Sequence, residues 1–139
     1  MISSFSDAED DREFKDNKEI MADLTTLANQ FDPDKATCRA IIETPKGSRN
    51  KFDYDPESNL FMLAGLLPEG MMFPFDFGFI PSTKGEDGDP VDIMVLMDAP
   101  AHVGCMIDVR IIGIIDAEQT QEGQTKKNSR ISRRRDPFV

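Results

Sequence analysis

The stretch "KGEDGDPVDIMVLMD", residues 84–98, joins a cluster of acidic residues to an apolar run. In its second half, "VDIMVLMD" (91–98), every residue except Asp92 and Asp98 is apolar. A short apolar run that follows Gly and Pro predicts a β-strand buried on at least one face. Carboxylates as crowded as those of the first half repel one another and raise each other's pKa unless a cation lies between them. The acidic half is therefore either a solvated turn or a cation site at the start of a buried strand.

Strand-like runs recur through the rest of the chain, separated by Pro, Gly, Asn and Ser. Their regular spacing predicts a mainly β domain that closes into a small barrel, rather than a parallel sheet with crossover helices. Before them, residues 18–30 carry apolar side chains at helical spacing and predict one flanking amphipathic helix, which ends before Pro33. The predicted strands cover residues 37–44, 51–55, 59–64, 73–81, 91–98 and 106–116.

The length of 139 residues predicts a single domain. Residues 1–17 are too polar to bury a core and are expected to form an acidic arm, and residues 18–125 form the barrel domain. Residues 126–139 form a basic tail, in which "KKNSRISRRR" carries six basic residues. We expect this tail to be a solvated end, with contact to a polyanion as the alternative.

The charge of the chain limits its partners. Sixteen basic residues against 26 acidic ones give a net charge of −10, which disfavours nucleic acid and anionic membranes. A negatively charged substrate then needs local cations or a bound metal ion in order to approach. The sequence has no apolar run near 18 residues and no signal peptide, and its two cysteines form neither a disulfide scaffold nor a CxxC motif. We therefore expect a cytoplasmic protein without a membrane segment.

The acids at positions 87, 89 and 92 are candidates for a metal site. Asp87, Asp89 and Asp92 stand at i, i+2 and i+5, a spacing that can bring carboxylate oxygens into one small volume at the start of a strand. Mg²⁺ prefers such oxygen ligands and keeps several water molecules. A calcium loop of the EF-hand type is a poor fit, because its fifth and sixth positions, counted from Asp87, are Val91 and Asp92 instead of a ligand and Gly.

A second constellation is cationic. The stretch "ETPKGSRNKFDYD" (43–55) places Lys46, Arg49 and Lys51 between two acids, Glu43 and Asp53. Alone, this pattern is typical of a polar hairpin rim. Beside a metal-binding carboxylate cluster it gains a second interpretation, because metal ions combined with Lys and Arg hold and polarise phosphate groups.

Three ordered blocks of the sequence resemble a known family. The blocks are "IETPKGSRNKFDYD", "FPFDFGFIPSTKGEDGDPVDIMVLMD" and "GCMIDVRIIGIIDAEQT", and they extend from about residue 41 to residue 120. Together they resemble the soluble (family I) inorganic pyrophosphatases, whose Asp-x-Asp-Pro-x-Asp signature matches "DGDPVDI". After about residue 120 the chain diverges from the family or is truncated relative to it.

The resemblance implies a five-stranded OB-like barrel with flanking helices, incomplete at its C-terminal side, and Mg²⁺-dependent hydrolysis of inorganic diphosphate to two phosphates. It implies assembly into homo-oligomers, because family members commonly oligomerise. By motif, the metal ligands are Asp87, Asp92 and Asp89, and Asp89 also orients the attacking water and accepts its proton. The implied substrate-binding residues are Lys51, Arg49 and Phe77, with Glu43 and Asp53 as supporting acids.

The chain departs from the family pattern at several positions. Gly65 stands where the best-studied members carry a phosphate-binding arginine, and Phe73 and Phe77 stand where they carry tyrosines. Further along, an expected acidic pair aligns near residues 119–120, and Ser129 takes the place of a metal-binding aspartate. The nearby acids that could compensate are Asp116, Glu118 and Glu122.

These departures leave two main hypotheses for function. The first is a Mg²⁺-dependent inorganic diphosphatase. The second is a catalytically impaired relative that binds metal or phosphate without turnover. A third, an OB-like nucleic-acid module, conflicts with the negative charge and with the lack of a basic, aromatic-lined groove.

Overall fold

The computed structural model describes residues 22–121 and 124–134, with side chains described as far as residue 115. The predicted N-terminal arm, residues 1–17, lies outside this part of the chain. The described residues form one short helical turn and seven strands. These elements are η2 (Leu24–Thr26), β1 (Thr37–Thr44), β2 (Asn50–Asp55), β3 (Leu60–Leu66), β4 (Asp76–Ile80), β5 (Val91–Leu96), β6 (Met106–Gln121) and β7 (Gln124–Arg134).

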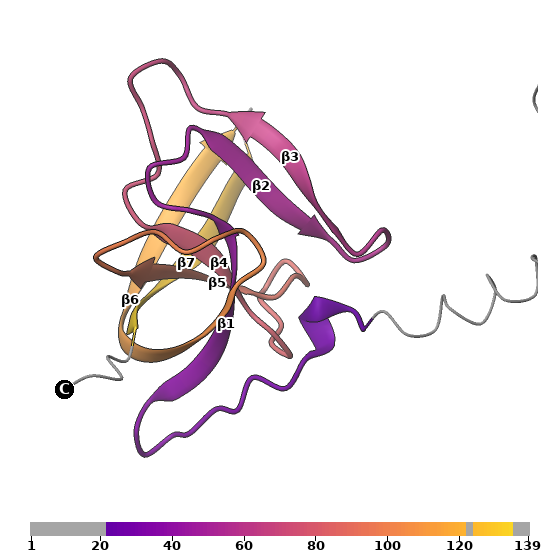
Figure 1. The fold of residues 1–139 in the computed structure, drawn as a ribbon, viewed down its shortest axis with the longest axis vertical. Helices are drawn as coiled ribbons and strands as arrows, with labels where there is room; N and C mark the ends of the chain where they lie inside the picture. The colour runs from indigo at the N-terminus through magenta and orange to yellow at the C-terminus, as the bar shows by residue number, and fades with distance from the viewer. Residues whose placement is uncertain (1–21, 122–123, 135–139) are drawn as a thin grey trace, which may run out of the picture.

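Five of the strands close into a barrel in the order β1-β4-β5-β7-β6, with β6 returning to β1 (Figure 1). All neighbours are antiparallel except β5 and β7, which run parallel. The expected mainly β, OB-like barrel is therefore confirmed, but the expectation that it is incomplete at its C-terminal side is wrong, because β7 pairs with both β5 and β6 and closes it. In the described ranges no helix is long and apolar enough to cross a lipid bilayer.

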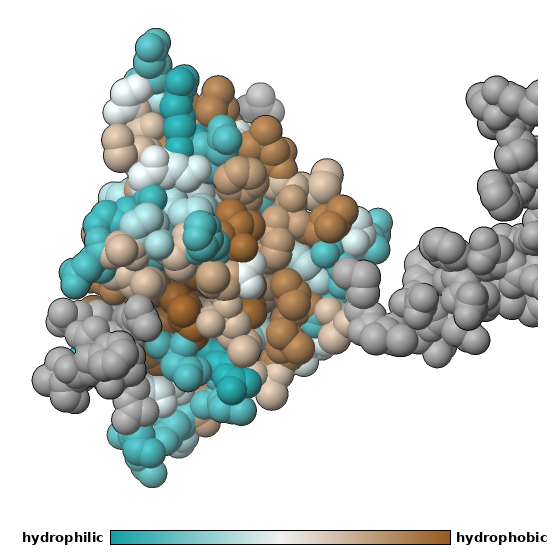
Figure 2. All heavy atoms as spheres, viewed as in Figure 1, coloured by the Kyte–Doolittle hydropathy of each residue, from teal (hydrophilic) through white to brown (hydrophobic). Residues whose placement is uncertain are grey.

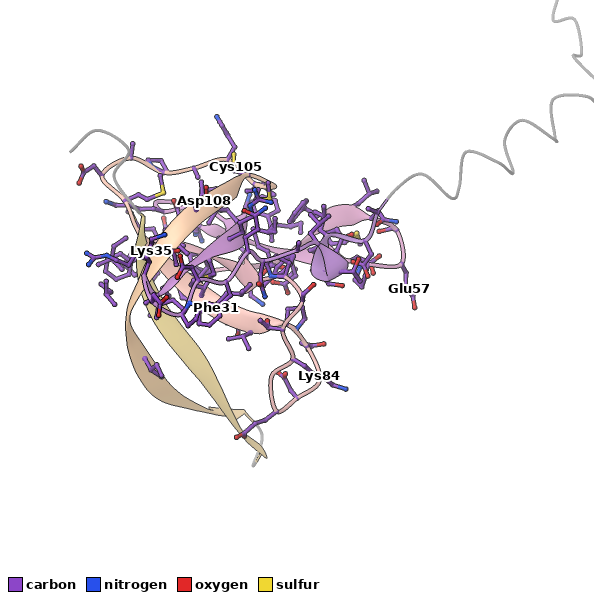
Figure 3. All side chains as sticks on the ribbon, turned by 90° about the horizontal axis from the view of Figure 1, so that it is seen from below. Phe31, Lys35, Glu57, Lys84, Cys105 and Asp108 are labelled. Carbon is purple, nitrogen blue, oxygen red and sulfur yellow. The ribbon has the colours of Figure 1, made fainter. Side chains whose placement is uncertain are left out.

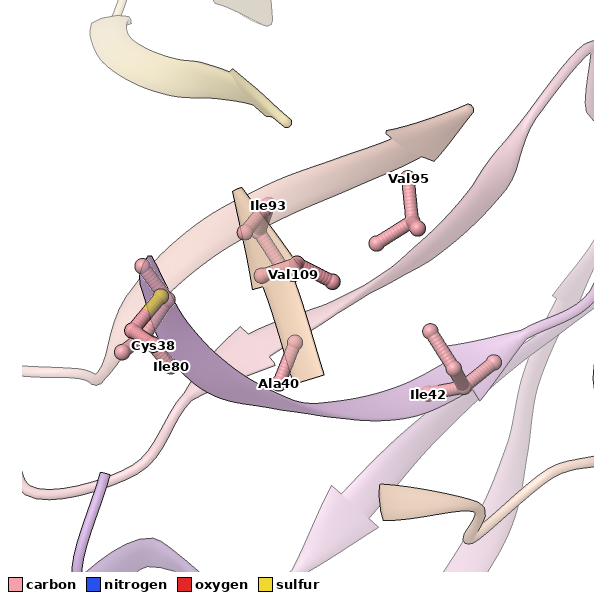
Figure 4. Packing of buried hydrophobic residues seen from close by; sticks show 7 residues of the cluster. All are labelled: Cys38, Ala40, Ile42, Ile80, Ile93, Val95 and Val109. Atoms are coloured by element: carbon pink, nitrogen blue, oxygen red, sulfur yellow. The ribbon is translucent and has the colours of Figure 1, made fainter. Parts of the chain in front are cut away.

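The barrel interior is built from alternate residues of its strands, because successive side chains of a strand point to opposite faces. The inward-facing buried side chains of β1, β4, β5 and β6 meet in one apolar cluster (Figure 4). This packing explains why "VDIMVLMD" forms a strand, since its Ile93 and Val95 are fully buried. The members of the cluster are Cys38, Ala40, Ile42, Ile80, Ile93, Val95 and Val109.

The remaining strands, β2 and β3, form a separate two-stranded sheet, called the hairpin below (Figure 1). Tyr54 of β2 packs against Ile41 and Phe79, which lie on the outer face of β1 and β4. The rings of Tyr54 and Phe79 are stacked, with centroids 5.9 Å apart. Four large apolar side chains of β3 are exposed: Leu60, Met62, Leu63 and Leu66. Figure 2 shows apolar residues gathered on the face of the molecule in view.

The helix predicted over residues 18–30 is wrong in its described part. Asp23 accepts a hydrogen bond from Thr25 N and caps a single turn, after which Leu27 is extended at φ −62° and ψ 148°. The chain then follows β1, because Asn29 O accepts a 2.7 Å hydrogen bond from Arg39 N. Leu24 and Leu27 pack against the cluster around Tyr54, so their spacing reflects burial without a helix.

The segment expected to be a basic tail includes β7. Ile131 of β7 pairs with Gly113 of β6 and with Met94 of β5, so residues 126–134 take part in the barrel sheet. The sequence did not predict this strand because "KKNSRISRR" contains a single apolar residue. Main-chain pairing to a long neighbouring strand leaves no signal in the composition.

A glycine allows the closest approach of two barrel strands. A Cβ at Gly78 would lie 1.8 Å from Ile41 O, whereas a Cβ at Gly113 of β6 would meet nothing within 4 Å. We predict that Gly78→Ala lowers the free energy of unfolding by about 3 kcal/mol or more, because backbone must move to relieve the clash. Gly113→Ala serves as the matched control and should change it by less than about 1 kcal/mol. Urea unfolding of both variants measures the difference, and equal stabilities would contradict the close approach.

Candidate metal and phosphate site

Glu43 reaches the hairpin because β1 has a bulge at this residue. Ile42 pairs with Gly78 and Thr44 with Phe77, so Glu43 is an extra residue in the ladder between β1 and β4. Bulges redirect side chains and are frequent beside functional sites. The Glu43 carboxylate accepts a 2.8 Å hydrogen bond at Oε1 from Tyr54 N, which links the barrel to β2.

The hairpin contributes one cation and one further acid. Lys51 and Asp53 stand two residues apart on β2 and therefore share a face. Lys51 Nζ lies 2.9 Å from Asp53 Oδ2, and both side chains are about half exposed. Across the ladder, Gly65 pairs with Lys51, so no side chain stands opposite the lysine.

The acid loop, residues 84–90, connects to β5 and projects from the body of the molecule, with the Lys84 side chain pointing outward (Figure 3). Asp87 Oδ1 accepts a 3.1 Å hydrogen bond from Asp89 N, and Gly85 N donates a 2.6 Å bond to Asp89 O. Between them Gly88 has φ +93°, a backbone conformation that favours glycine. Asp87 and Asp89 are exposed, and Asp92 on β5 is half-buried.

The acids of the barrel, the hairpin and the loop influence one another's protonation. Burial raises the pKa of Glu43 to about 7, and the negative charges of Asp53 and Asp92 add to this rise against the opposing effects of the Tyr54 N–H and Lys51. Burial also raises the pKa of Asp92, followed by the charge of Asp87, with Lys51 acting in the opposite direction. Six predicted site residues therefore lie in one electrostatic environment: Glu43, Lys51, Asp53, Asp87, Asp89 and Asp92.

Two other predicted site residues have structural contacts of their own. Arg49 Nε donates a 2.9 Å hydrogen bond to Leu67 O, and Leu67 N donates back to Arg49 O at 2.8 Å. This pair of bonds joins the residue before β2 to the residue after β3, at the open end of the hairpin. Phe77 on β4 is half-buried and packs edge-on against Phe73, with centroids 5.4 Å apart. Substrate binding by Arg49 and by Phe77 stays a prediction.

Asp76 lies within the aromatic stretch "FPFDFGFIP" (73–81), where the sequence is compatible with either a buried hydrogen-bonding acid or a wall of the site. In the structure it is 1% exposed, and its two oxygens accept from Lys46 N at 2.6 Å and from Ala101 N at 3.0 Å. Asp76 thus joins the turn before β2 to the loop before β6. Its position inside an aromatic strand was the signal that marked it. The acids considered as compensating ligands, Asp116, Glu118 and Glu122, and Ser129 lie beyond the described side chains.

The donor set fits a hard divalent cation in its chemistry. Carboxylate oxygens are the ligands that Mg²⁺ prefers, and a cation among these acids would relieve the repulsion that raises the pKa of Glu43 and Asp92. Across the described part of the chain, however, no group of three Asp, Glu, His or Cys side chains is close enough to hold an ion.

Comparison with known proteins gives a consistent result. The family model described as "Inorganic pyrophosphatase" matches residues 40–127. A relative from Synechocystis sp. with that name is 42% identical over 94 residues, which are 68% of this chain and 54% of the relative. Another from Thermus thermophilus is 43% identical over 86 residues, which are 62% of this chain and 49% of the relative. The chain spans about half the length of the curated relatives it matches.

Solved structures agree with the sequence comparison. The inorganic pyrophosphatase from Thermus thermophilus superposes with a TM-score of 0.70 at 35% identity, covering 81% of this chain and 62% of that chain. The enzyme from Neisseria gonorrhoeae gives a TM-score of 0.72 at 25% identity, covering 84% of this chain and 65% of that chain.

The pKa of Glu43 predicts a pH dependence of stability. The pKa of Glu43 in the folded protein, about 7, lies above the ordinary value of 4.5. Its contribution to the stability of the folded protein is therefore fully present below about pH 4.5 and is lost as the pH rises to about 7. With a chelator present to remove metal ions, the free energy of unfolding of the wild type should fall by roughly 2 kcal/mol relative to that of Glu43→Gln between pH 5 and pH 8. This value follows from about 1.4 kcal/mol per unit of pKa shift, reduced because the carboxyl is partly exposed. Urea unfolding at both pH values tests this, with Glu57→Gln on the exposed hairpin turn as control. A difference that does not vary with pH would contradict the burial of Glu43.

Proposed function

The chain belongs to the inorganic pyrophosphatase family, and from this premise we propose that it hydrolyses inorganic diphosphate to two phosphates with Mg²⁺ as cofactor. One observation carries the proposal beyond family membership. The pKa values of Glu43 and Asp92 are changed by charges that come from three parts of the structure. These parts are the barrel, the acid loop and the Lys51–Asp53 pair of the hairpin. A site of this kind suits a small, highly charged substrate that arrives with a metal ion.

The proposed metal ligands are Asp87, Asp89 and Asp92. When bound, Mg²⁺ supplies positive charge to the diphosphate and lowers the pKa of a coordinated water molecule. Asp89 is exposed in the acid loop, and we assign it the orientation of the attacking water and the acceptance of its proton. Its main-chain N–H and C=O are both held within the loop, which limits the positions that the carboxylate can take.

Lys51 is the proposed phosphate ligand of the hairpin. Asp53 pairs with its ammonium group at 2.9 Å and keeps it over the β2 face until a phosphate competes for it. Glu43 is the proposed supporting acid, whose half-buried carboxyl adds negative charge at high pH and withdraws it at low pH. Arg49 and Phe77 are proposed to border the substrate, and we propose cytoplasmic localisation and homo-oligomeric assembly by analogy with the family.

Phosphate release from diphosphate tests the proposal directly. With Mg²⁺ the folded protein should release phosphate, and without Mg²⁺ the release should fall to background. Asp89→Asn should reduce kcat by about 100-fold or more, because loss of a general base costs about 10²–10⁴ in rate. Asp98→Asn removes an exposed acid at the end of the same sequence stretch and serves as the matched control, with activity near wild type.

Two outcomes would contradict the proposed function or the proposed role of Asp89. If a folded sample shows no Mg²⁺-dependent release, the chain is not a diphosphatase. Thermal stabilisation by diphosphate in that sample would favour a relative that binds without turnover. If Asp89→Asn retains full activity, the base is another residue.

Gly65 offers a test of the phosphate side of the site. The resemblance aligns Gly65 with a phosphate-binding arginine. In the structure Gly65 pairs with Lys51 across the hairpin, and a Cβ on Gly65 would meet nothing within 4 Å. We predict that Gly65→Arg folds normally and lowers KM for diphosphate by about tenfold, since a charged hydrogen bond contributes about 1.5–3 kcal/mol. Gly65→Met provides similar bulk without charge and should leave KM unchanged. Equal kinetics for the two variants would place the substrate away from Lys51.

A further inference from the structure

We propose that the hydroxyl group of Thr44 is the positioning group that sets Lys51 and Asp53 against the acids of the barrel. This inference rests on the proposed function. Thr44 is the last residue of β1 and is 2% exposed. Its Oγ1 donates a 3.0 Å hydrogen bond to Phe52 O and accepts a 2.9 Å bond from Phe52 N. One side chain therefore satisfies both main-chain polar groups of one residue in β2.

Such a contact matters because the hairpin and the barrel are separate sheets. Among the described strands, β2 pairs with β3 alone, so no main-chain ladder fixes its position relative to β1. A hydroxyl that donates to a carbonyl and accepts from an N–H can replace the two bonds that a neighbouring strand would provide. Thr44 thus provides at one point what a β1–β2 ladder would otherwise provide.

The residue that Thr44 holds lies between the two functional residues of the hairpin. Phe52 points to one face of β2, and Lys51 and Asp53 point to the other. Fixing both polar groups of Phe52 therefore fixes the peptide planes on either side, which set the directions of the Lys51 and Asp53 side chains. The pairing of β2 with β3 changes register between Lys51 and Phe52, so the ladder is irregular where the hydroxyl acts.

Removing the hydroxyl should leave the hairpin attached. Tyr54 still packs on Phe79, its hydroxyl still accepts a 3.0 Å hydrogen bond from Leu24 N, and Glu43 still accepts from Tyr54 N. We therefore expect Thr44→Val to fold with its functional face displaced. Thr44→Ser keeps the hydroxyl and loses only a methyl group, so it separates positioning from packing.

Two measurements test the inference together. By NMR hydrogen exchange, the Phe52 amide should be protected in wild type and Thr44→Ser and should exchange at least about tenfold faster in Thr44→Val. In the same samples kcat/KM for Mg²⁺-diphosphate should fall about tenfold or more in Thr44→Val and stay within about threefold of wild type in Thr44→Ser. Thr26→Val removes a hydroxyl that binds Asp23 O in η2 and should match wild type in both measurements.

The other outcomes either contradict the role of Thr44 or show that the proposed function itself is wrong. If the hydrogen exchange of the Phe52 amide is unchanged in Thr44→Val, the Thr44 hydroxyl does not hold Phe52. If this exchange is faster but kcat/KM is unchanged, the hydroxyl does not position Lys51 and Asp53. Equal activity losses in the Val and Ser variants assign Thr44 to packing alone. If wild type releases no phosphate, the proposed function fails. The positioning role of Thr44 is then tested by the affinity for inorganic phosphate in the presence of Mg²⁺. Thr44→Val should then bind more weakly than Thr44→Ser, and equal affinities overturn the inference.

Discussion

The candidate site depends on how the hairpin docks onto the barrel through side chains of β1. The barrel carries Glu43 and Asp92, the hairpin carries Lys51 and Asp53, and the two sheets share no ladder among the described strands. Docking therefore uses an apolar contact, Tyr54 on Phe79, together with side chains of β1 that bind the main chain of β2. A buried main-chain group without a partner costs about 1–3 kcal/mol, so these few bonds have a large effect on the relative position of the sheets.

The same docking creates the electrostatic character of the site. It brings Asp53 near the barrel acids Glu43 and Asp92, and the opposing charge nearby is that of Lys51, which is already paired with Asp53. Burial and repulsion raise the pKa of Glu43 and Asp92, which makes the metal-free protein pay a stability penalty near neutral pH. A divalent cation bound among these acids, as proposed, would reduce this penalty by neutralising their repulsion. The acid loop is exposed, whereas Asp92 is half-buried on its strand.

Some parts of the structure could be predicted from sequence and others could not, for physical reasons. The apolar runs of β1, β5 and β6 predicted strands because burial of one face imposes a period on the sequence. The same reasoning failed at Leu24 and Leu27, where helical spacing serves packing of an extended segment, and at β7, whose main-chain pairing needs few apolar residues. The crowding of Asp87, Asp89 and Asp92 predicts a cation site because carboxylates so close together repel one another, and their role as metal ligands stays a prediction. The role of Thr44 was not, since a β-branched residue in a strand is ordinary and its contact is eight residues away.

We propose that the barrel acids and the hairpin form one cation and phosphate site. Paramagnetic broadening by Mn²⁺, added in place of Mg²⁺ and followed by NMR in the presence of inorganic phosphate, tests this arrangement. The amide signals of Asp87 and Asp92 and those of Lys51 and Asp53 should broaden together at the same Mn²⁺ concentration. Broadening confined to the acid loop, with the signals of the hairpin unchanged, would contradict it.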